Sequence, residues 1–239
     1  MSRPRLLLFL LFSALASVIG WSGGLRPDPE AAGMDRERLR EIPRRMQAFV
    51  DDSTIAGAVT LVARNGQVAA LDAVGSADLA TRRSLEKDSL FWIASMTKPL
   101  TATAVAMLVD EGKLALDDPV EKILPEFKGQ WMIDSRGESA MTLVRPPRAI
   151  TIRDLLTHTS GLGDVSSPRP DCALAELVMG YAREPLQFAP GSKWQYSTAG
   201  INTLGRVVEV VSGQPFAVFL QRQILDPLGM KDTTFWPTR

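Results

Sequence analysis

Hydrophobic positions recur at helical spacing in the first charged part of the chain. Apolar side chains stand three or four residues apart over residues 39–50, on a segment otherwise rich in Arg and Glu. This pattern predicts an amphipathic helix whose apolar face is formed by Leu39, Ile42, Met46, Phe49 and Val50. Pro43 lies inside the pattern, so we expect a kink or a late start of the helix there.

Two apolar runs separated by a turn follow this helix. The runs cover residues 58–63 and 68–74, and the pair Asn65-Gly66 between them is the preferred sequence for a two-residue hairpin turn. The pattern therefore predicts a β-hairpin. A helix followed directly by a hairpin indicates an antiparallel sheet with a helix packed on one face.

From residue 90 onward the pattern is mainly helical. Residues 99–109 are apolar on nearly every side, as expected for a helix in the centre of a domain, and Gly112 is placed to end it. A second apolar pattern over residues 201–211 is closed by Gly213 in the same way. These two segments predict the central helices of the fold.

Further local signals predict where the shorter helices begin and end and where a loop lies. Thr151 and Asp154 have the spacing of a capping box, which marks a helix start. A last helix is expected to begin near Pro215 and to break at Pro227. Residues 129–149 mix Trp, Gly and Pro, which predicts an extended surface loop or a small flap.

The first part of the chain has the pattern of an export signal. Two arginines precede an almost uninterrupted apolar run over residues 6–19, which suits a signal-peptide core and is short for a membrane span. We expect residues 1–22 to be a signal peptide, or a signal anchor that tethers the protein to a membrane if it stays uncleaved. A linker over 23–33 and one domain over 34–239 then follow, with the functional part periplasmic or secreted.

The composition argues against a nucleic-acid-binding protein and against a metal site built from several histidines. The 239 residues are 45% hydrophobic and 23% charged, which fits one globular unit with a core. Lys plus Arg and Asp plus Glu both number 27, so no basic surface points to a nucleic-acid partner. The single cysteine, Cys172, excludes an intrachain disulfide, and the single histidine, His158, excludes a metal site built from several histidines.

Ser95 and Lys98 are the first candidates for chemistry. Residues three apart on a helix share a face, so the Lys98 amine is expected within reach of the Ser95 hydroxyl. A serine needs an adjacent base to become a nucleophile, and a lysine serves once burial favours its neutral form. The apolar helix that follows predicts a poorly solvated Lys98. Taken alone, the same spacing is more often an ordinary capped helix start than a catalytic pair.

Other residues invite a catalytic interpretation that their surroundings do not favour. Tyr196 lies near Trp194 before a helix, where a phenol can shuttle a proton, but in isolation we interpret it as a packing residue because of its aromatic neighbour. We interpret His158 as structural, bonding free carbonyls at a helix end. Residues 20–24 match the G-x-S-x-G pattern without a preceding strand, a chance match, and Cys172 is expected to be an inert thiol.

Four segments together resemble the serine beta-lactamase and penicillin-binding superfamily. They are Ser95-Met96-Thr97-Lys98-Pro99, residues 155–162, Tyr196-Ser197-Thr198 and Pro227-Leu228-Gly229-Met230. The branch that looks most similar contains class C beta-lactamases with related esterases and D-amino-acid peptidases. The resemblance implies an α/β fold of the α+β type, with an antiparallel sheet flanked by helices and a mainly helical subdomain.

The resemblance also implies roles for individual residues. Ser95 would be the acylated nucleophile and Lys98 its base, while Tyr196 would protonate the leaving group and help deliver the deacylating water. The Ser95 N–H would supply half of an oxyanion hole. The substrate would be a small molecule or short peptide with an ester, amide or strained cyclic amide bond, and no metal or organic cofactor is implied.

One departure from the family concerns substrate binding. The family usually has Tyr-x-Asn, whereas the third position here is Thr198. Asparagine offers two donors and an acceptor, while threonine offers one hydroxyl on a shorter arm. A substrate amide would be held less well, so we expect ester or short-peptide hydrolysis in preference to beta-lactam hydrolysis.

The other departure concerns the family's third motif. After Tyr196 no Lys-Thr-Gly or His-x-Gly appears, and the chain ends at residue 239. We therefore expect an N-terminal portion of a longer enzyme whose C-terminal strands are missing, with low solubility and residual activity when it is expressed alone. A non-catalytic penicillin- or peptidoglycan-binding relative and an inactive fragment are the alternatives. No pattern in the sequence selects an oligomeric state.

Overall fold

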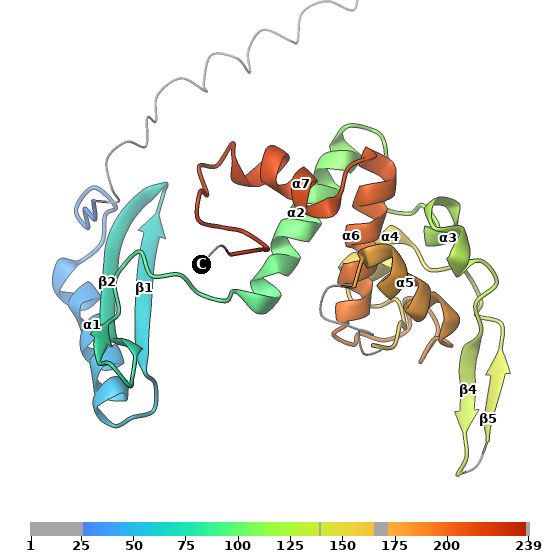
Figure 1. The fold of residues 1–239 in the computed structure, drawn as a ribbon, viewed down its shortest axis with the longest axis horizontal. Coiled ribbons are helices and arrows are strands. Elements are labelled where there is room, and N and C mark those ends of the chain that lie inside the picture. Colours follow the sequence, from blue (N-terminus) through green and yellow to red (C-terminus); the bar gives the residue numbers. More distant parts are fainter. Residues whose placement is uncertain (1–25, 139, 165–171, 238–239) are drawn as a thin grey trace, which may run out of the picture. The chain divides into compact units, whose positions relative to one another are not determined.

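The computed structural model describes residues 26–138, 140–164 and 172–237. The chain divides into two compact units, one up to Phe91 and one from Trp92 onward (Figure 1). The expected signal segment, residues 1–22, lies outside the described residues. In the described ranges, no helix combines the length and the apolar character that a membrane span requires.

The first unit pairs one helix with an antiparallel sheet. Helix α1 (Arg36–Asp51) packs against β1 (Gly57–Arg64) and β2 (Gln67–Asp78), and the short β3 (Arg83–Ser84) completes the strand order β1-β2-β3 (Figure 1). This arrangement confirms the predicted helix and hairpin. Helix α1 begins at Arg36, so the late start is wrong and Pro43 lies inside the helix.

The hairpin turn has the geometry that its sequence predicts. Asn65 and Gly66 have φ angles of 52° and 75°, both in the left-handed region, and Arg64 lies opposite Gln67. A two-residue turn of this kind matches the twist of the flanking strands. The turn therefore sets the pairing of Arg64 with Gln67 and of Ala63 with Val68, and an irregularity between Val62 and Ala63 shifts the register of the rest of the hairpin.

Residues 26–33, part of the expected linker, contact the first unit. The Asp28 N–H donates to the Val68 carbonyl at 2.8 Å. Ala32 is buried in a small apolar cluster with Leu39 and Ala69. This segment is therefore tied to the sheet by both a backbone bond and apolar contact.

The second unit is built around one buried helix. Its helices are α2 (Thr97–Asp110), α3 (Val120–Ile123), α4 (Ile152–Leu156), α5 (Leu174–Arg183), α6 (Thr198–Ser212) and α7 (Phe216–Leu220), which continues as a π-helical turn (Gln221–Leu225). Helix α6 packs against α2, α3, α4, α5 and α7. Its side chains Leu204, Val207 and Val208 are fully buried. The predicted helices over 99–109, over 201–211 and after Pro215 are confirmed, and the strands and helices together confirm the α/β class.

Helix α2 is buried along one stripe within this unit. Thr101, Ala104, Val105 and Leu108 face the core at helical spacing, whereas Ala106 is exposed. Burial of α2 is therefore one-sided, although its sequence is apolar nearly all round.

Two paired strands lie within residues 129–149, where we expected an extended surface loop or a small flap. Strands β4 (Met132–Arg136) and β5 (Met141–Val144) pair antiparallel (Figure 1). The Ile133 N–H donates to the Leu186 carbonyl at 2.8 Å, which anchors β4 beyond the end of α5. The Arg145 guanidinium stacks 3.7 Å from the Trp131 ring centroid beside the hairpin.

Candidate active site

The Ser95 hydroxyl and the Lys98 amine are in contact. Ser95 lies in a 3₁₀ turn (Ala94–Met96) that runs directly into α2, and Lys98 belongs to the first turn of α2. The Lys98 Nζ donates a hydrogen bond to Ser95 Oγ at 3.2 Å. Ser95 is exposed and Lys98 is half-buried. The spacing predicted this contact from the sequence.

The backbone just before Ser95 is strained. Ala94 has a φ of 42°, in the left-handed region that residues with a Cβ rarely adopt. Such conformations cost about 1–3 kcal/mol and persist only where the surrounding structure holds them. The strained residue lies directly before the candidate nucleophile, at the point where the chain turns into α2.

Tyr196 faces the Ser95–Lys98 pair from the segment that precedes α6. The Lys98 Nζ lies 4.8 Å from the centroid of the Tyr196 ring. Hydrogen bonds with the side chains of Lys98 and Ser95 lower the pKa of the Tyr196 phenol, against a smaller opposing effect of burial. The three polar groups therefore meet, although Tyr196 is 98 positions away from Lys98 in the sequence.

His158 supports the segment that carries Tyr196. We expected its side chain to bond free carbonyls at the end of α4, but it bonds the Ser197 N–H instead. Its Nδ1 accepts the Ser197 N–H at 3.2 Å, and its backbone carbonyl accepts the Gln195 N–H at 2.9 Å. The imidazole and Tyr196 ring centroids are 4.8 Å apart. Burial and the nearby Lys98 charge lower the pKa of His158, while the Ser197 bond acts in the opposite direction.

Thr198 is the first residue of α6 and is exposed. The buried Ser197 before it caps the helix, since its Oγ accepts the Gly200 N–H at 3.0 Å. A serine followed by a glycine three residues later gave a weak sequence signal for this cap, and we did not use it. The cap fixes the start of α6 and places Thr198 two residues from the phenol.

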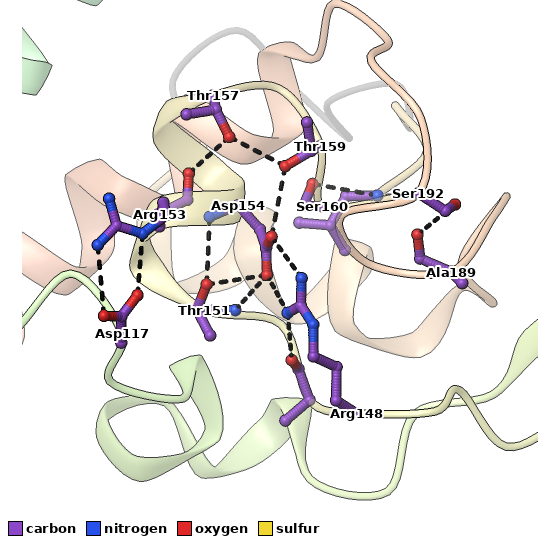
Figure 2. Close-up of polar contacts among 12 residues, drawn as sticks. Asp117, Arg148, Thr151, Arg153, Asp154, Thr157, Thr159, Ser160, Ala189 and Ser192 are labelled. Atoms are coloured by element: carbon purple, nitrogen blue, oxygen red, sulfur yellow. Dashed lines mark hydrogen bonds and ion pairs between the residues drawn. The ribbon is translucent and has the colours of Figure 1, made fainter.

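A buried carboxylate holds the loop that carries His158. Figure 2 shows Asp154 at the centre of hydrogen bonds from Arg148, Thr151 and Thr159, with Thr151 and Asp154 forming the predicted capping box of α4. Burial raises the pKa of Asp154, but these bonds outweigh it, so the pKa is lowered overall. The carboxylate therefore stays ionised and ties α4 to the residue that follows His158.

The glycine of this loop is fixed by close backbone contact. Gly161 has a φ of 80°, and a Cβ there would lie 2.3 Å from the Phe188 carbonyl oxygen. The Gln187 N–H also donates to the Gly161 carbonyl at 2.7 Å. Only glycine fits this position, which explains the glycine that follows Thr159 and Ser160.

Cys172 is half-buried, and its thiol donates to the Ala173 carbonyl at 3.5 Å. No bond between Cys172 and Ser95, Lys98 or Tyr196 is present among the described residues. The G-x-S-x-G match over residues 20–24 lies outside the described residues.

The chain is similar to a known family over most of its length. A family model described as Beta-lactamase matches residues 42–239. Esterase EstB of Burkholderia gladioli is 39% identical over 229 residues, which cover 87% of this chain and 54% of that protein. The lovastatin esterase of Penicillium rubens is 33% identical over 206 residues, covering 80% of this chain and 51% of that protein.

A solved structure gives the same result at the level of the fold. EstCE1, described as a hydrolase with promiscuous acyltransferase activity, superposes with a TM-score of 0.73 at 30% identity. The match covers 84% of this chain and 54% of that one. The chain spans about half the length of the curated relatives it matches.

Proposed function

Because the chain belongs to the serine beta-lactamase and penicillin-binding protein superfamily, we propose that it acts as an acyl-serine hydrolase with Ser95 as the nucleophile. The observation that carries the proposal is the 3.2 Å contact between Lys98 Nζ and Ser95 Oγ. The Tyr196 phenol adds a second proton-carrying group beside that pair. A nucleophile with adjacent acid–base groups is the arrangement that acyl transfer requires.

Each group has a definite task in the proposed acylation. Ser95 Oγ attacks the carbonyl carbon of the substrate, and its proton passes to the Lys98–Tyr196 pair, which at that moment lacks one proton (a neutral Lys98 amine or a Tyr196 phenolate beside the Lys98 ammonium). The negative charge that develops on the carbonyl oxygen is stabilised by the Ser95 N–H as one oxyanion donor. Tyr196 then gives the proton to the leaving alcohol or amine, and the bond from the carbonyl carbon to that group breaks.

Deacylation uses the same pair in the same way. A water molecule attacks the acyl-serine carbonyl carbon and gives its proton to the Lys98–Tyr196 pair. The bond to Ser95 Oγ breaks, and that proton returns to the serine oxygen. A carboxylic acid is released, and the groups return to their starting protonation states.

Esters and short peptides are the proposed substrates. Thr198 offers one hydroxyl at the position where the family usually has an asparagine, so a substrate amide gains fewer hydrogen bonds there. The names of two similar proteins, esterase EstB and lovastatin esterase, support an ester as substrate. No step of the proposed reaction requires a metal or an organic cofactor.

Covalent labelling tests the nucleophile. The full chain is treated with a fluorophosphonate, and hydrolysis of an aryl ester is followed in parallel, for the natural sequence, Ser95→Ala and the control Ser135→Ala on the exposed strand β4. We expect labelling and residual turnover in the natural sequence and the control, and neither in Ser95→Ala. Labelling that survives Ser95→Ala contradicts the proposal, and labelling without turnover supports the penicillin- or peptidoglycan-binding alternative.

Export is a separate proposal. The apolar run over residues 6–19 supports a signal peptide that directs the protein to the periplasm or the medium. Mass measurement of the protein recovered from each cell fraction tests it. Cleavage close to residue 22 supports export, an intact leader in the membrane fraction supports the anchor, and an intact cytoplasmic protein contradicts both.

A further inference from the structure

We infer that His158 is a positioning residue of the acyl-serine site: its imidazole and its carbonyl oxygen hold residues 195–197 so that the Tyr196 phenol faces Ser95 and Lys98. The inference rests on the proposed function of Ser95. It adds a fourth residue, whose own atoms do not contact the reacting bond.

His158 accepts two hydrogen bonds, one from the residue before Tyr196 and one from the residue after it. The His158 carbonyl accepts the Gln195 N–H at 2.9 Å, and the His158 Nδ1 accepts the Ser197 N–H at 3.2 Å. The backbone is thus anchored on both sides of the tyrosine. With both neighbours fixed, the Tyr196 side chain leaves the backbone in one direction.

The imidazole also contacts the tyrosine ring itself. The two ring centroids are 4.8 Å apart with planes inclined by 32°. The Lys98 ammonium lies at the same 4.8 Å from the Tyr196 centroid. The Tyr196 ring therefore contacts both His158 and Lys98, and the Trp194 ring stands nearly perpendicular to the imidazole with the centroids 6.2 Å apart.

Two properties suit histidine to this position. His158 has a φ of 60°, which histidine and asparagine tolerate better than most residues with a Cβ. Accepting the Ser197 N–H requires an unprotonated Nδ1, so the neutral imidazole carries its proton on Nε2. Protonation would turn Nδ1 into a donor facing another donor, and the bond would be lost.

Burial and one charged neighbour favour the neutral imidazole. Burial has the largest effect and lowers the pKa of His158, and the positive charge of Lys98, from α2, lowers it further. Asp154, from α4, is engaged by Arg148 and Thr151. Asp164 lies at the start of α6, where its carboxylate accepts the Ala199 N–H at 2.6 Å.

A matched pair of substitutions tests the inference on the full chain. His158→Asn keeps an acceptor near the Ser197 N–H and tolerates the left-handed backbone, whereas His158→Gly tolerates the backbone and has no acceptor. We expect fluorophosphonate labelling of Ser95 to slow about tenfold in His158→Gly and to recover to within about threefold in His158→Asn. In the natural sequence the labelling rate should fall in acid both when the Lys98–Tyr196 pair is protonated and when His158 is protonated. His158→Asn should lose only the second contribution, because asparagine does not titrate.

Two readouts do not depend on reactivity. His158 is the only histidine, so its NMR signals report its tautomer and titration without competition. The Tyr196 phenol, titrated by absorbance in a Tyr181→Phe background, should show a raised pKa in His158→Gly, because the phenol leaves the hydrogen bonds of Lys98 and Ser95.

The outcomes separate this inference from the proposed function. An unchanged Tyr196 titration and an unchanged labelling rate in His158→Gly overturn the inference. Equal losses in both variants with the natural pH profile also overturn it, since a general structural role explains them. Absence of labelling in the natural sequence would instead remove the hydrolase proposal, and the phenol titration would still decide the role of His158.

Discussion

The only two tyrosines of the chain have opposite environments. Hydrogen bonds with Lys98 and Ser95 lower the pKa of the exposed Tyr196. Burial raises the pKa of Tyr181, whose hydroxyl accepts a hydrogen bond from Asn202 at 2.9 Å. A phenol that ionises more easily than usual, placed beside a serine, is suited to accept and return a proton.

Titration of Tyr196 checks this environment directly. In a Tyr181→Phe background, the remaining phenol should titrate below the range of free tyrosine, and Lys98→Met should move its pKa upward by removing a hydrogen bond and a positive charge. Near-ultraviolet absorbance of the tyrosinate follows the titration. A phenol with the same pKa in both proteins would show that Lys98 does not act on it.

Thr198 carries the prediction on substrate preference. Thr198→Asn restores an amide side chain that can donate to and accept from a substrate amide, so the rate on a cephalosporin relative to an aryl ester should rise roughly fivefold, the effect of about one hydrogen bond. The ratio of kcat/KM values measures it. Thr198→Ser is the control, because it keeps a single hydroxyl. Equal turnover of both substrates by the natural sequence would contradict the preference.

At the scale of elements, two ion pairs on α4 provide a comparison. The Asp154 side chain is 5% exposed and bonds Arg148, whereas Asp117, which bonds Arg153, is 77% exposed (Figure 2). Asp154→Asn should lower the free energy of unfolding by roughly 2 kcal/mol, because buried donors lose a charged acceptor. Asp117→Asn should cause no measurable loss. Denaturant unfolding of both variants checks the difference, and equal losses would contradict it.

The Asp154 network also predicts a pH dependence. The folded-state pKa of Asp154 is lowered, so the ionised carboxylate contributes stability above its unfolded pKa, and this contribution is lost as the pH falls through the folded one. The difference in melting temperature between the natural sequence and Asp154→Asn should therefore shrink below about pH 4. A difference that stays constant into acid would exclude ionisation of Asp154 as its cause.

Local signals in the sequence predicted the local structure. The hairpin turn at Asn65-Gly66, the capping box at Thr151 and the contact between Ser95 and Lys98 each involve residues at most three apart. The same rule would have found α5, where Leu174, Leu177, Val178 and Tyr181 follow helical spacing. The sequence analysis made no prediction for residues 174–183.

Contacts between distant residues were not predictable in this way. Residues 39 positions apart form the bond from the Ser197 N–H to His158 Nδ1, and no periodicity encodes it. The sequence alone favoured a helix-end role for His158 and a packing role for Tyr196. Only the family resemblance placed Tyr196 with Ser95, and the fold then brought the two together.

Across the whole molecule, the apolar core is unevenly distributed. In the second unit a large buried cluster surrounds α6, which packs against five other helices. In the first unit the buried cluster contains Ala32, Leu39 and Ala69. Strands β4 and β5 form a two-stranded sheet whose side chains are mostly exposed. Resistance to local opening should follow this distribution.

Hydrogen exchange followed by mass spectrometry tests that expectation. The amides of α6 should exchange last, because opening this helix exposes Leu204, Val207 and Val208 together with their partners in the core. The β4–β5 hairpin should exchange early, since two strands without a packed face are only marginally stable. Leu204→Ala, at an expected cost of about 2–5 kcal/mol, should speed the exchange of α6 much more than that of the hairpin. Protection of the hairpin equal to that of α6 would mean that a further contact covers it.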